Sequence, residues 1–484
     1  MAAMVIALLL SLLSLFFSVL LLKWNQMKYR EKELPPGTMG WPVVGETTEF
    51  LKQGHRFMKN QRARFGSFFK THFLGSPAII CMDPDLNRYI MMNEAKGFVP
   101  GYPQAMIQIL GERNIAAVHG AAHKKMRGSL LSAISPAMIR DHLLPTVDAF
   151  MRSFLSNWED KIIDIQKKSK EMSLLSSLKQ VAGIESGPMF EALVSEFFKL
   201  VLGTFSLPIN FPGTSYRSGL QARKNIVMLL DQLLQERKAS KKPYNDMLGH
   251  MMKTEDNRFQ LTDDELIDQI ITIMYAGYET ISVTSMMAVK YLHDHPKALE
   301  ELRKEHLSLR EKKKPDDPIH FLDIKSMGFT RAVIYETSRL ATVVNGVLRK
   351  TTRAVELNGY TIPKDWRIYV YTRESNYDPC VYPEPMSFNP WRWLDKSLDN
   401  QNNFLFGGGT RLCPGKEFGV IEISTFLHYL VTRYRLAFIS IQPKTLLKRH
   451  NPQTDESLSS ADGRKSAARS FWSSREFSPP MAFT

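Results

Sequence analysis

The residue types best suited to chemistry lie in a short glycine-rich stretch at positions 406–415, which contains one cysteine. Consecutive glycines form a poor helix and a poor strand, but they let the backbone lie close against a flat ligand. Pro414 suits the first turn of a helix, and residues 416–429 have the apolar spacing of that helix. Cys413 is therefore expected at a helix N-terminus, where free N–H groups and the helix dipole lower the pKa of a thiol. A thiolate held in this way is a good ligand for iron.

Several positions of this stretch match a known pattern. Their spacing, Phe-x-x-Gly-x-Arg-x-Cys-x-Gly, resembles the haem-binding signature of the cytochrome P-450 superfamily and is filled by Phe406, Gly409, Arg411, Cys413 and Gly415. The alternative is a buried structural cysteine in a glycine loop, but so many fixed positions seldom agree by chance. The resemblance implies that Cys413 is the axial ligand of haem b (iron protoporphyrin IX), that the other four positions surround the haem, and that Arg411 meets a propionate. It also implies a mainly α fold with small β-sheets, triangular in outline, around a long central helix.

A long helix is predicted over residues 263–293. Thr262 and Glu265 have the spacing of a capping box at its start, and Pro296 prevents its continuation. At about 1.5 Å per residue the helix would be about 45 Å long, enough to cross the whole body. Its middle is apolar on nearly every side, so it is expected to be buried.

The buried part of this helix contains a glycine and an acid, which both cost stability there. One interpretation is a helix kink with a hydrogen-bonded glutamate. The stretch also resembles the oxygen-activation motif of the superfamily. That resemblance implies that Ala276 and Gly277 leave room for dioxygen, and that Glu279 and Thr280 deliver protons to it. Ile281 departs from the motif, in which threonine or serine is usual at this position.

A charge network is the third expected feature. Glu336 and Arg339 are three residues apart in a predicted helix over residues 330–340, so their side chains share one face. Most such pairs lie on solvated surfaces. However, the order of this pair, then Arg392 between two tryptophans, then the cysteine stretch resembles the same superfamily. The resemblance implies a buried network of all three charges that holds the segment before Cys413 in place, a role in geometry more than in net stability.

Three further basic side chains are expected at the haem. His123 and Arg127 share one face of a predicted helix, and superfamily members often have tryptophan and arginine at this spacing. The resemblance implies that this pair contacts the haem propionates and that Arg349 is another partner. A solvated basic patch is the alternative for His123 and Arg127.

The N-terminus predicts a membrane anchor. Residues 2–22 carry no charged side chain, and a helix needs about 20 residues to cross a bilayer. Basic residues follow from Lys23 onward and favour a cytosolic position for the rest of the chain. A cleaved signal peptide is the alternative, but no basic residue precedes the apolar run and bulky residues continue up to Lys23. We therefore expect an anchor over residues 1–23, a single pass in the endoplasmic reticulum membrane, and a stiff, basic and proline-rich hinge over residues 24–45.

The bulk composition is that of a globular protein, with 484 residues of which 44% are hydrophobic and 23% charged. No repeat or flexible linker divides the chain, so one catalytic domain is expected over residues 46–435. The formal charge of +14 favours an acidic partner or a membrane surface, and no nucleic-acid motif accompanies it. The three cysteines are too few and too scattered for a disulfide framework and indicate a reducing compartment.

Between about residue 35 and Arg435 the chain resembles the plant brassinosteroid C-6 oxidases, notably at residues 101–103, 114–120, 275–280, 286–301 and 329–350. The resemblance implies hydroxylation of a steroid at C-6 and oxidation to the ketone, as in the conversion of 6-deoxocastasterone to castasterone. It implies O2 and electrons from NADPH–cytochrome P-450 reductase, whose acidic face suits the charge of the chain. An apolar pocket also suits another sterol, a terpenoid or a fatty acid. Its expected polar contacts are Gln104, Gln108, Thr272 and Asn345.

After Arg435 the resemblance is expected to fail. Residues 436–484 are rich in serine and charge and are expected to be an atypical, disordered tail without the strands that close the substrate pocket. This leaves a rival function, a haem-binding membrane protein with little turnover. A haem-thiolate isomerase or dehydratase is a third reading, which Glu279 and Thr280 argue against because such chemistry needs no proton delivery to dioxygen.

Overall fold

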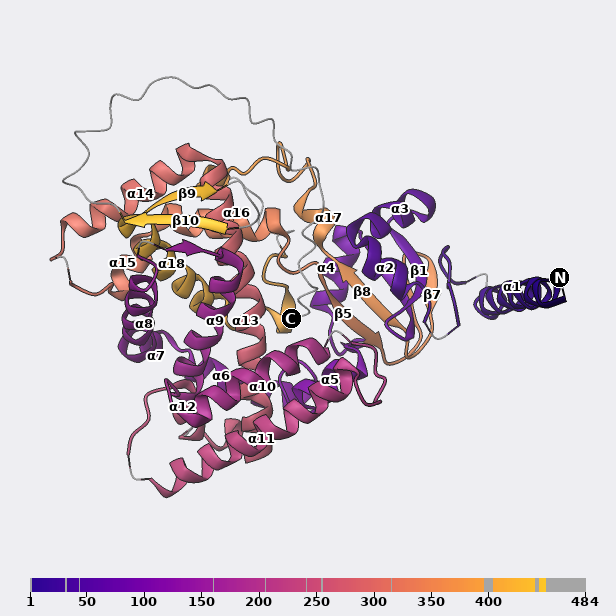
Figure 1. Ribbon diagram of the computed structural model, residues 1–484, viewed down its shortest axis with the longest axis horizontal. Helices are drawn as coiled ribbons and strands as arrows, with labels where there is room; N and C mark the ends of the chain where they lie inside the picture. The colour runs from indigo at the N-terminus through magenta and orange to yellow at the C-terminus, as the bar shows by residue number, and fades with distance from the viewer. Residues whose placement is uncertain are drawn as a thin grey trace.

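The computed structural model describes residues 2–449 except 31–32, 43, 160, 205, 241, 254–255, 315, 396–403 and 440–443. Its elements form a large helical body and a smaller part built around a sheet, and α1 projects from the side of the sheet (Figure 1). The predicted fold class, mainly helical with small sheets and one apolar N-terminal helix, is confirmed.

The helices differ widely in length, and the long ones build the body. Their bounds are α1 Ala2–Lys28, α2 Thr47–Gln53, α3 His55–Phe65, α4 Pro84–Met92, α5 Gln104–Leu110, α6 Gly120–Ala133, α7 Pro136–Met138, α8 Leu144–Ser156, α9 Ile165–Ala182, α10 Pro188–Thr204, α11 Ser215–Ala239, α12 Met247–Met252, α13 Asp263–Asp294, α14 Pro296–Glu311, α15 Phe321–Ser326, α16 Gly328–Ala341, α17 Arg373–Asn376 and α18 Lys416–Arg433.

The strands form three sheets within the described residues, and the largest is mixed, with the order β1-β2-β8-β5-β3. The other two have the orders β4-β10-β9 and β6-β7. The bounds are β1 Phe68–Phe73, β2 Ser76–Cys81, β3 Phe98–Pro100, β4 Ile162–Ile163, β5 Gly346–Thr351, β6 Val355–Leu357, β7 Tyr360–Ile362, β8 Arg367–Tyr371, β9 Tyr434–Ile439 and β10 Lys444–Arg449. In the largest sheet β5 runs antiparallel to β8, with Arg349 opposite Ile368.

The predicted long helix is confirmed as α13, which ends at Asp294, one residue later than expected. Its start has the predicted capping box: the backbone N–H of Glu265 donates to the Thr262 hydroxyl, and the Glu265 carboxylate accepts from the Thr262 backbone. The helix packs against α9, α16 and α18, so its middle is in the core as its apolar sequence requires.

The apolar helix α1 is long enough to cross a membrane. Its candidate span, Met4–Lys28, covers 25 residues with a mean hydropathy of 2.9, and its most apolar part is not buried in the protein. The helix continues past residue 23 to Lys28, and its last turns contact the segment that follows. The Asn25 amide donates to the Gly40 carbonyl at 2.9 Å, and the Gln26 amide donates to the Gly37 carbonyl at 3.2 Å. These bonds tie the end of α1 to the proline-rich segment.

The expectation that the whole of residues 436–484 is disordered is wrong for two stretches. Strand β9 continues to Ile439, and β10 pairs with it antiparallel, with Leu446 opposite Ala437. Leu446 also lies opposite Ile162 of β4, which is a partner distant in sequence. Because serine and charged residues dominate the composition of this tail, the sequence did not reveal short strand-forming runs, one of which pairs with a distant strand. Residues 440–443 and 450–484, the rest of the expected tail, lie outside the described residues.

Candidate active site

One cavity of about 300 Å³ brings together residues from distant parts of the chain. Its wall is mainly apolar, and both α13 and α18 contribute residues to it. The predicted site residues that line it are Ala276, Gly277 and Thr280 of α13, His123 and Arg127 of α6, Arg349 of β5, and Phe406, Arg411, Cys413 and Gly415 of the cysteine stretch. Gly409, Glu279, Glu336, Arg339 and Arg392 are not among the lining residues.

The cysteine loop, residues 404–415, is held by its own backbone. The Cys413 N–H donates to the Phe406 carbonyl at 2.9 Å. Gly409 has a φ of +65°, and a Cβ there would lie 2.5 Å from the carbonyl oxygen of Met91 in α4. Gly409 therefore allows the loop to pack against α4, whereas Gly407 and Gly408 face the cavity.

The pKa of Cys413 was expected to be lowered, but its surroundings in the protein raise it. Burial raises the pKa of this thiol above its ordinary value, because a thiolate loses its hydration there. Backbone N–H groups of Gly415 and Lys416, and the charge of Arg127, act in the opposite direction but do not outweigh burial. The helix itself begins at Lys416, with Gly415 as its cap. A metal cation bound to this sulfur would favour the thiolate and so oppose the effect of burial.

Arg411 is bound by a residue that the sequence analysis missed. Its Nε donates to both carboxylate oxygens of Glu94 at 3.0 and 2.9 Å, and its Nη2 donates to Glu94 Oε1 at 2.7 Å. Nη1 donates to the Ile115 carbonyl at 2.7 Å, and Nη2 also donates to the Val118 carbonyl. Glu94 follows α4, and no local pattern marks it, because its partner is 317 residues later in the chain.

The cavity wall near Arg411 carries further basic groups. Burial, with Arg411 next, lowers the pKa of His123 to about 4, so this imidazole is neutral. Arg349 is buried, and its Nε has no hydrogen-bond partner among the described residues. A buried guanidinium N–H without a partner is costly, so an anion is needed here. This orphaned donor, the flat glycine backbone and the thiol of Cys413 together fit a haem with its propionates.

Helix α13 presents small and hydroxyl side chains to the cavity. The Thr280 hydroxyl donates to the Ala276 carbonyl at 2.8 Å, one turn earlier. Gly277 packs against α9, where the Ser173 hydroxyl donates to its carbonyl at 2.9 Å. Glu279 is not among the residues that line the cavity. It is 2% exposed, and its Oε2 has no hydrogen-bond partner among the described residues. Burial raises its pKa, and the charge of Lys170 only partly opposes this.

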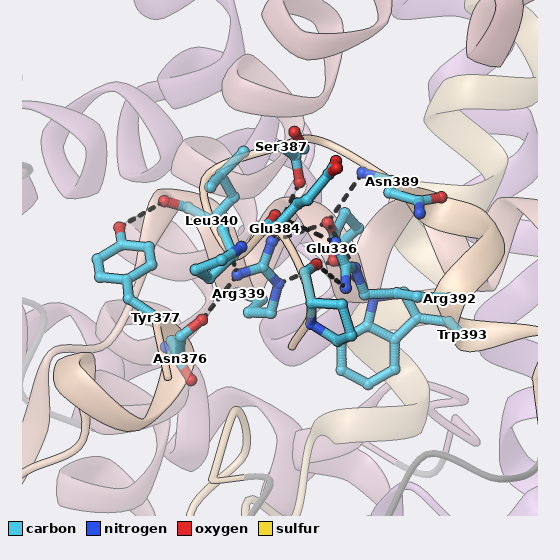
Figure 2. A network of polar contacts seen from close by, with 12 residues as sticks. Glu336, Arg339, Leu340, Asn376, Tyr377, Glu384, Ser387, Asn389, Arg392 and Trp393 are labelled. Carbon is cyan, nitrogen blue, oxygen red and sulfur yellow. Dashed lines mark hydrogen bonds and ion pairs between the residues drawn. The ribbon is translucent and has the colours of Figure 1, made fainter. Parts of the chain in front are cut away.

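Figure 2 shows the network that joins Glu336, Arg339 and Arg392. Arg339 donates from Nε to Glu336 Oε2 at 2.9 Å and from Nη2 to Oε1 at 2.8 Å. Arg392 Nε donates to Glu336 Oε1 at 3.2 Å. The sequence did not indicate two further donors to this carboxylate, the Asn389 backbone N–H at 2.9 Å and the Trp393 indole at 2.8 Å. The network thus joins α16 to the segment that leads toward the cysteine loop.

The expected polar substrate contacts are mostly elsewhere. Thr272 lines the cavity, and its hydroxyl has no partner among the described residues. Gln108 is exposed and accepts a hydrogen bond from Tyr216, and Gln104 is exposed as well. Asn345 is not among the lining residues either. Thr272 is thus the one expected contact in the wall.

Comparisons with known proteins agree with this geometry. The family described as Cytochrome P450 matches residues 35–454, and so continues past Arg435, where the resemblance was expected to fail. The chain is 70% identical over 420 residues to Cytochrome P450 85A1 of Solanum lycopersicum, which covers 87% of this chain and 90% of the relative. It is 34% identical over 415 residues to the 3-epi-6-deoxocathasterone 23-monooxygenase CYP90D1 of Arabidopsis thaliana, covering 83% and 84% of the two chains.

A solved structure shares the fold. Retinoic acid bound cyanobacterial CYP120A1 superposes with a TM-score of 0.79 at 25% sequence identity, covering 86% of this chain and 99% of that one. Together with the family match over most of the sequence, this assigns the chain to a known class of enzyme. The chain belongs to the cytochrome P450 family and is a monooxygenase that depends on haem iron.

Proposed function

We propose that this monooxygenase oxidises a steroid at C-6, hydroxylating a 6-deoxo brassinosteroid precursor and then oxidising the new alcohol to a ketone, as from 6-deoxocastasterone to castasterone. The observation that carries the proposal is the 70% identity to a Cytochrome P450 85A1 over most of both chains. The resemblance of residues 275–280, 286–301 and 329–350 to brassinosteroid C-6 oxidases supports the same proposal. The mainly apolar cavity beside Cys413 suits a flat steroid, and Thr272 offers a hydroxyl in its wall.

The cofactor in this proposal is haem b, whose iron activates O2 for insertion into a C–H bond. Cys413 would hold the iron through its sulfur, and Phe406 and Gly415 would lie against the cofactor. Arg127, Arg349 and the free N–H of Arg411 neutralise the propionates. His123, neutral by its lowered pKa, can donate one hydrogen bond without adding charge.

Helix α13 supplies protons in this proposal. Ala276 and Gly277 lack bulk where dioxygen must fit. Thr280 has its hydroxyl at the cavity, fixed by the Ala276 carbonyl, and can pass on a proton from its own O–H. Burial raises the pKa of Glu279, and its Oε2 has no hydrogen-bond partner among the described residues, so this carboxyl holds a proton more readily than an exposed one and can return it through water to Thr280.

Thr280→Ala tests this proton role. The variant should keep its haem, while product formation falls on the order of 10²-fold and NADPH oxidation continues, with hydrogen peroxide released instead. The measurement is the ratio of product to NADPH oxidised. Thr284→Ala is the matched control, because Thr284 lies on the same face one turn later and makes the same kind of bond, to the Thr280 carbonyl. Equal ratios in the two variants would contradict the role of Thr280.

The redox partner and location belong to the same proposal. Electrons come from NADPH–cytochrome P-450 reductase, whose acidic surface suits a chain of formal charge +14. Helix α1 crosses the endoplasmic reticulum membrane once, with residues 1–23 as the anchor, 24–45 as the hinge and the domain that begins at residue 46 in the cytosol.

Turnover of the purified full chain tests the proposed function directly. Reconstituted with the reductase and NADPH, it should convert 6-deoxocastasterone first to the 6-alcohol and then to castasterone, detected by mass spectrometry. Omission of NADPH is the control. Bound haem with no product from any 6-deoxo brassinosteroid would defeat the proposal, and product only from another sterol or a terpenoid would reassign the substrate.

A further inference from the structure

Glu94 is a buried carboxylate bound to Arg411, which lines the cavity. Its side chain is 6% exposed and that of Arg411 is 11% exposed. Besides its contacts with Arg411, Glu94 accepts a hydrogen bond from the Thr410 hydroxyl at 3.1 Å. It therefore joins the chain just after α4 to two neighbouring residues of the cysteine loop.

The contacts of Arg411 leave little freedom to its guanidinium. Of the five N–H groups that an arginine carries, Nε–H and one on Nη2 bond to Glu94. The other on Nη2 bonds to the Val118 carbonyl, and one on Nη1 bonds to the Ile115 carbonyl. A single Nη1 N–H remains for a ligand in the cavity. Because Glu94 holds the opposite edge of the plane, it decides where this last donor points.

Glu94 offsets part of the positive charge beside the cavity. Arg127, Arg349 and Arg411 line the cavity as cations, and Glu94 forms an ion pair with one of them, Arg411. Burial raises the pKa of Glu94, but the bonds and charge of Arg411, with Arg349 nearby, more than offset this and hold the pKa below its ordinary value. Glu94 is therefore ionised at neutral pH.

We propose that Glu94 is a positioning residue of the haem site: it aims Arg411 at a propionate, and its charge keeps the reduction potential of the iron low. This inference rests on the haem arrangement proposed above and not on the identity of the steroid. Without the charge of Glu94, the positive charge of Arg411 would lose its counter-ion beside a bound haem. Such a charge favours the reduced iron, so the potential would become more positive.

Two substitutions separate charge from geometry. Glu94→Gln keeps the length of the side chain and an acceptor oxygen but removes the charge, so the reduction potential should shift to a more positive value. Glu94→Asp keeps the charge but shortens the reach to Arg411, so the potential should stay near that of the unchanged protein while haem is lost on the order of tenfold faster. The measurements, on the full chain with haem, are a dye-monitored potential titration and the rate of haem transfer to excess apomyoglobin.

Asp246→Asn is the matched control, because Asp246 and Arg237 form an ion pair with exposures of 11% and 3%, about as buried as Glu94 and Arg411. Neither residue lines the cavity, so this variant should lose stability without a shift in potential. An unshifted potential in Glu94→Gln would overturn the charge effect, and an unchanged rate of haem loss in Glu94→Asp would overturn the positioning. If even the unchanged chain binds no haem through Cys413, the haem arrangement itself fails, which is a different result from either.

Discussion

Cys413→Ala is expected to abolish the thiolate-type absorption of the reduced carbon monoxide complex and to reduce steroid oxidation to background. The sulfur lies in the wall of the same cavity that Thr280 and the three arginines line. Alanine offers no ligand, and the neighbouring side chains at the loop, Leu412 and Pro414, offer none either. The measurement is the difference spectrum of the dithionite-reduced protein with and without carbon monoxide.

The other two cysteines are the controls for this result. Cys81 is buried in β2 of the largest sheet and, unlike Cys413, is not among the residues that line the cavity. Cys380 is exposed. Cys81→Ala and Cys380→Ala should both keep the thiolate-type spectrum. If that spectrum survived in Cys413→Ala and vanished in either control, the proposed ligand would be wrong.

Glu336→Ala is expected to lower the free energy of unfolding by about 3–5 kcal/mol and to leave little bound haem. The carboxylate is fully buried and accepts from two arginines, an indole and a backbone N–H. Its removal leaves Arg339 and Arg392 as buried cations without their counter-ion, which is far more costly than the loss of one hydrogen bond. Denaturant unfolding followed by circular dichroism gives the free energy, and the haem absorbance gives the occupancy.

An exposed ion pair on the same helix provides the comparison. Arg331 of α16 contacts Glu417 at 3.2 Å, and the Glu417 side chain is 51% exposed. Glu417→Ala should change the free energy of unfolding by about 1 kcal/mol or less, because water replaces most of what the pair contributes. A Glu336→Ala variant as stable as Glu417→Ala would show that the network does not hold this part of the fold.

The sequence by itself determined those features whose partners are close along the chain. Thr262 and Glu265 are one helical turn apart, so the capping box and the start of α13 could be predicted from spacing alone. Glu336 and Arg339 share a helix face for the same reason. The cysteine stretch was identified from the order of its residue types, and the structure brings that stretch, α6, α13 and β5 to one cavity.

Features that depend on partners distant in sequence, or on burial, became evident only in the tertiary structure. Glu94 reaches Arg411 only because the end of α4 packs on the cysteine loop, and Gly409 is needed for that packing. The pairing of β10 with β4 likewise joins segments far apart in the chain, so the sequence suggested disorder where strands form. The pKa of Cys413 differs from expectation because desolvation outweighs the helix terminus. Spacing along the chain determines which side chains share a helical turn, whereas tertiary packing determines which of them are desolvated and which come into contact.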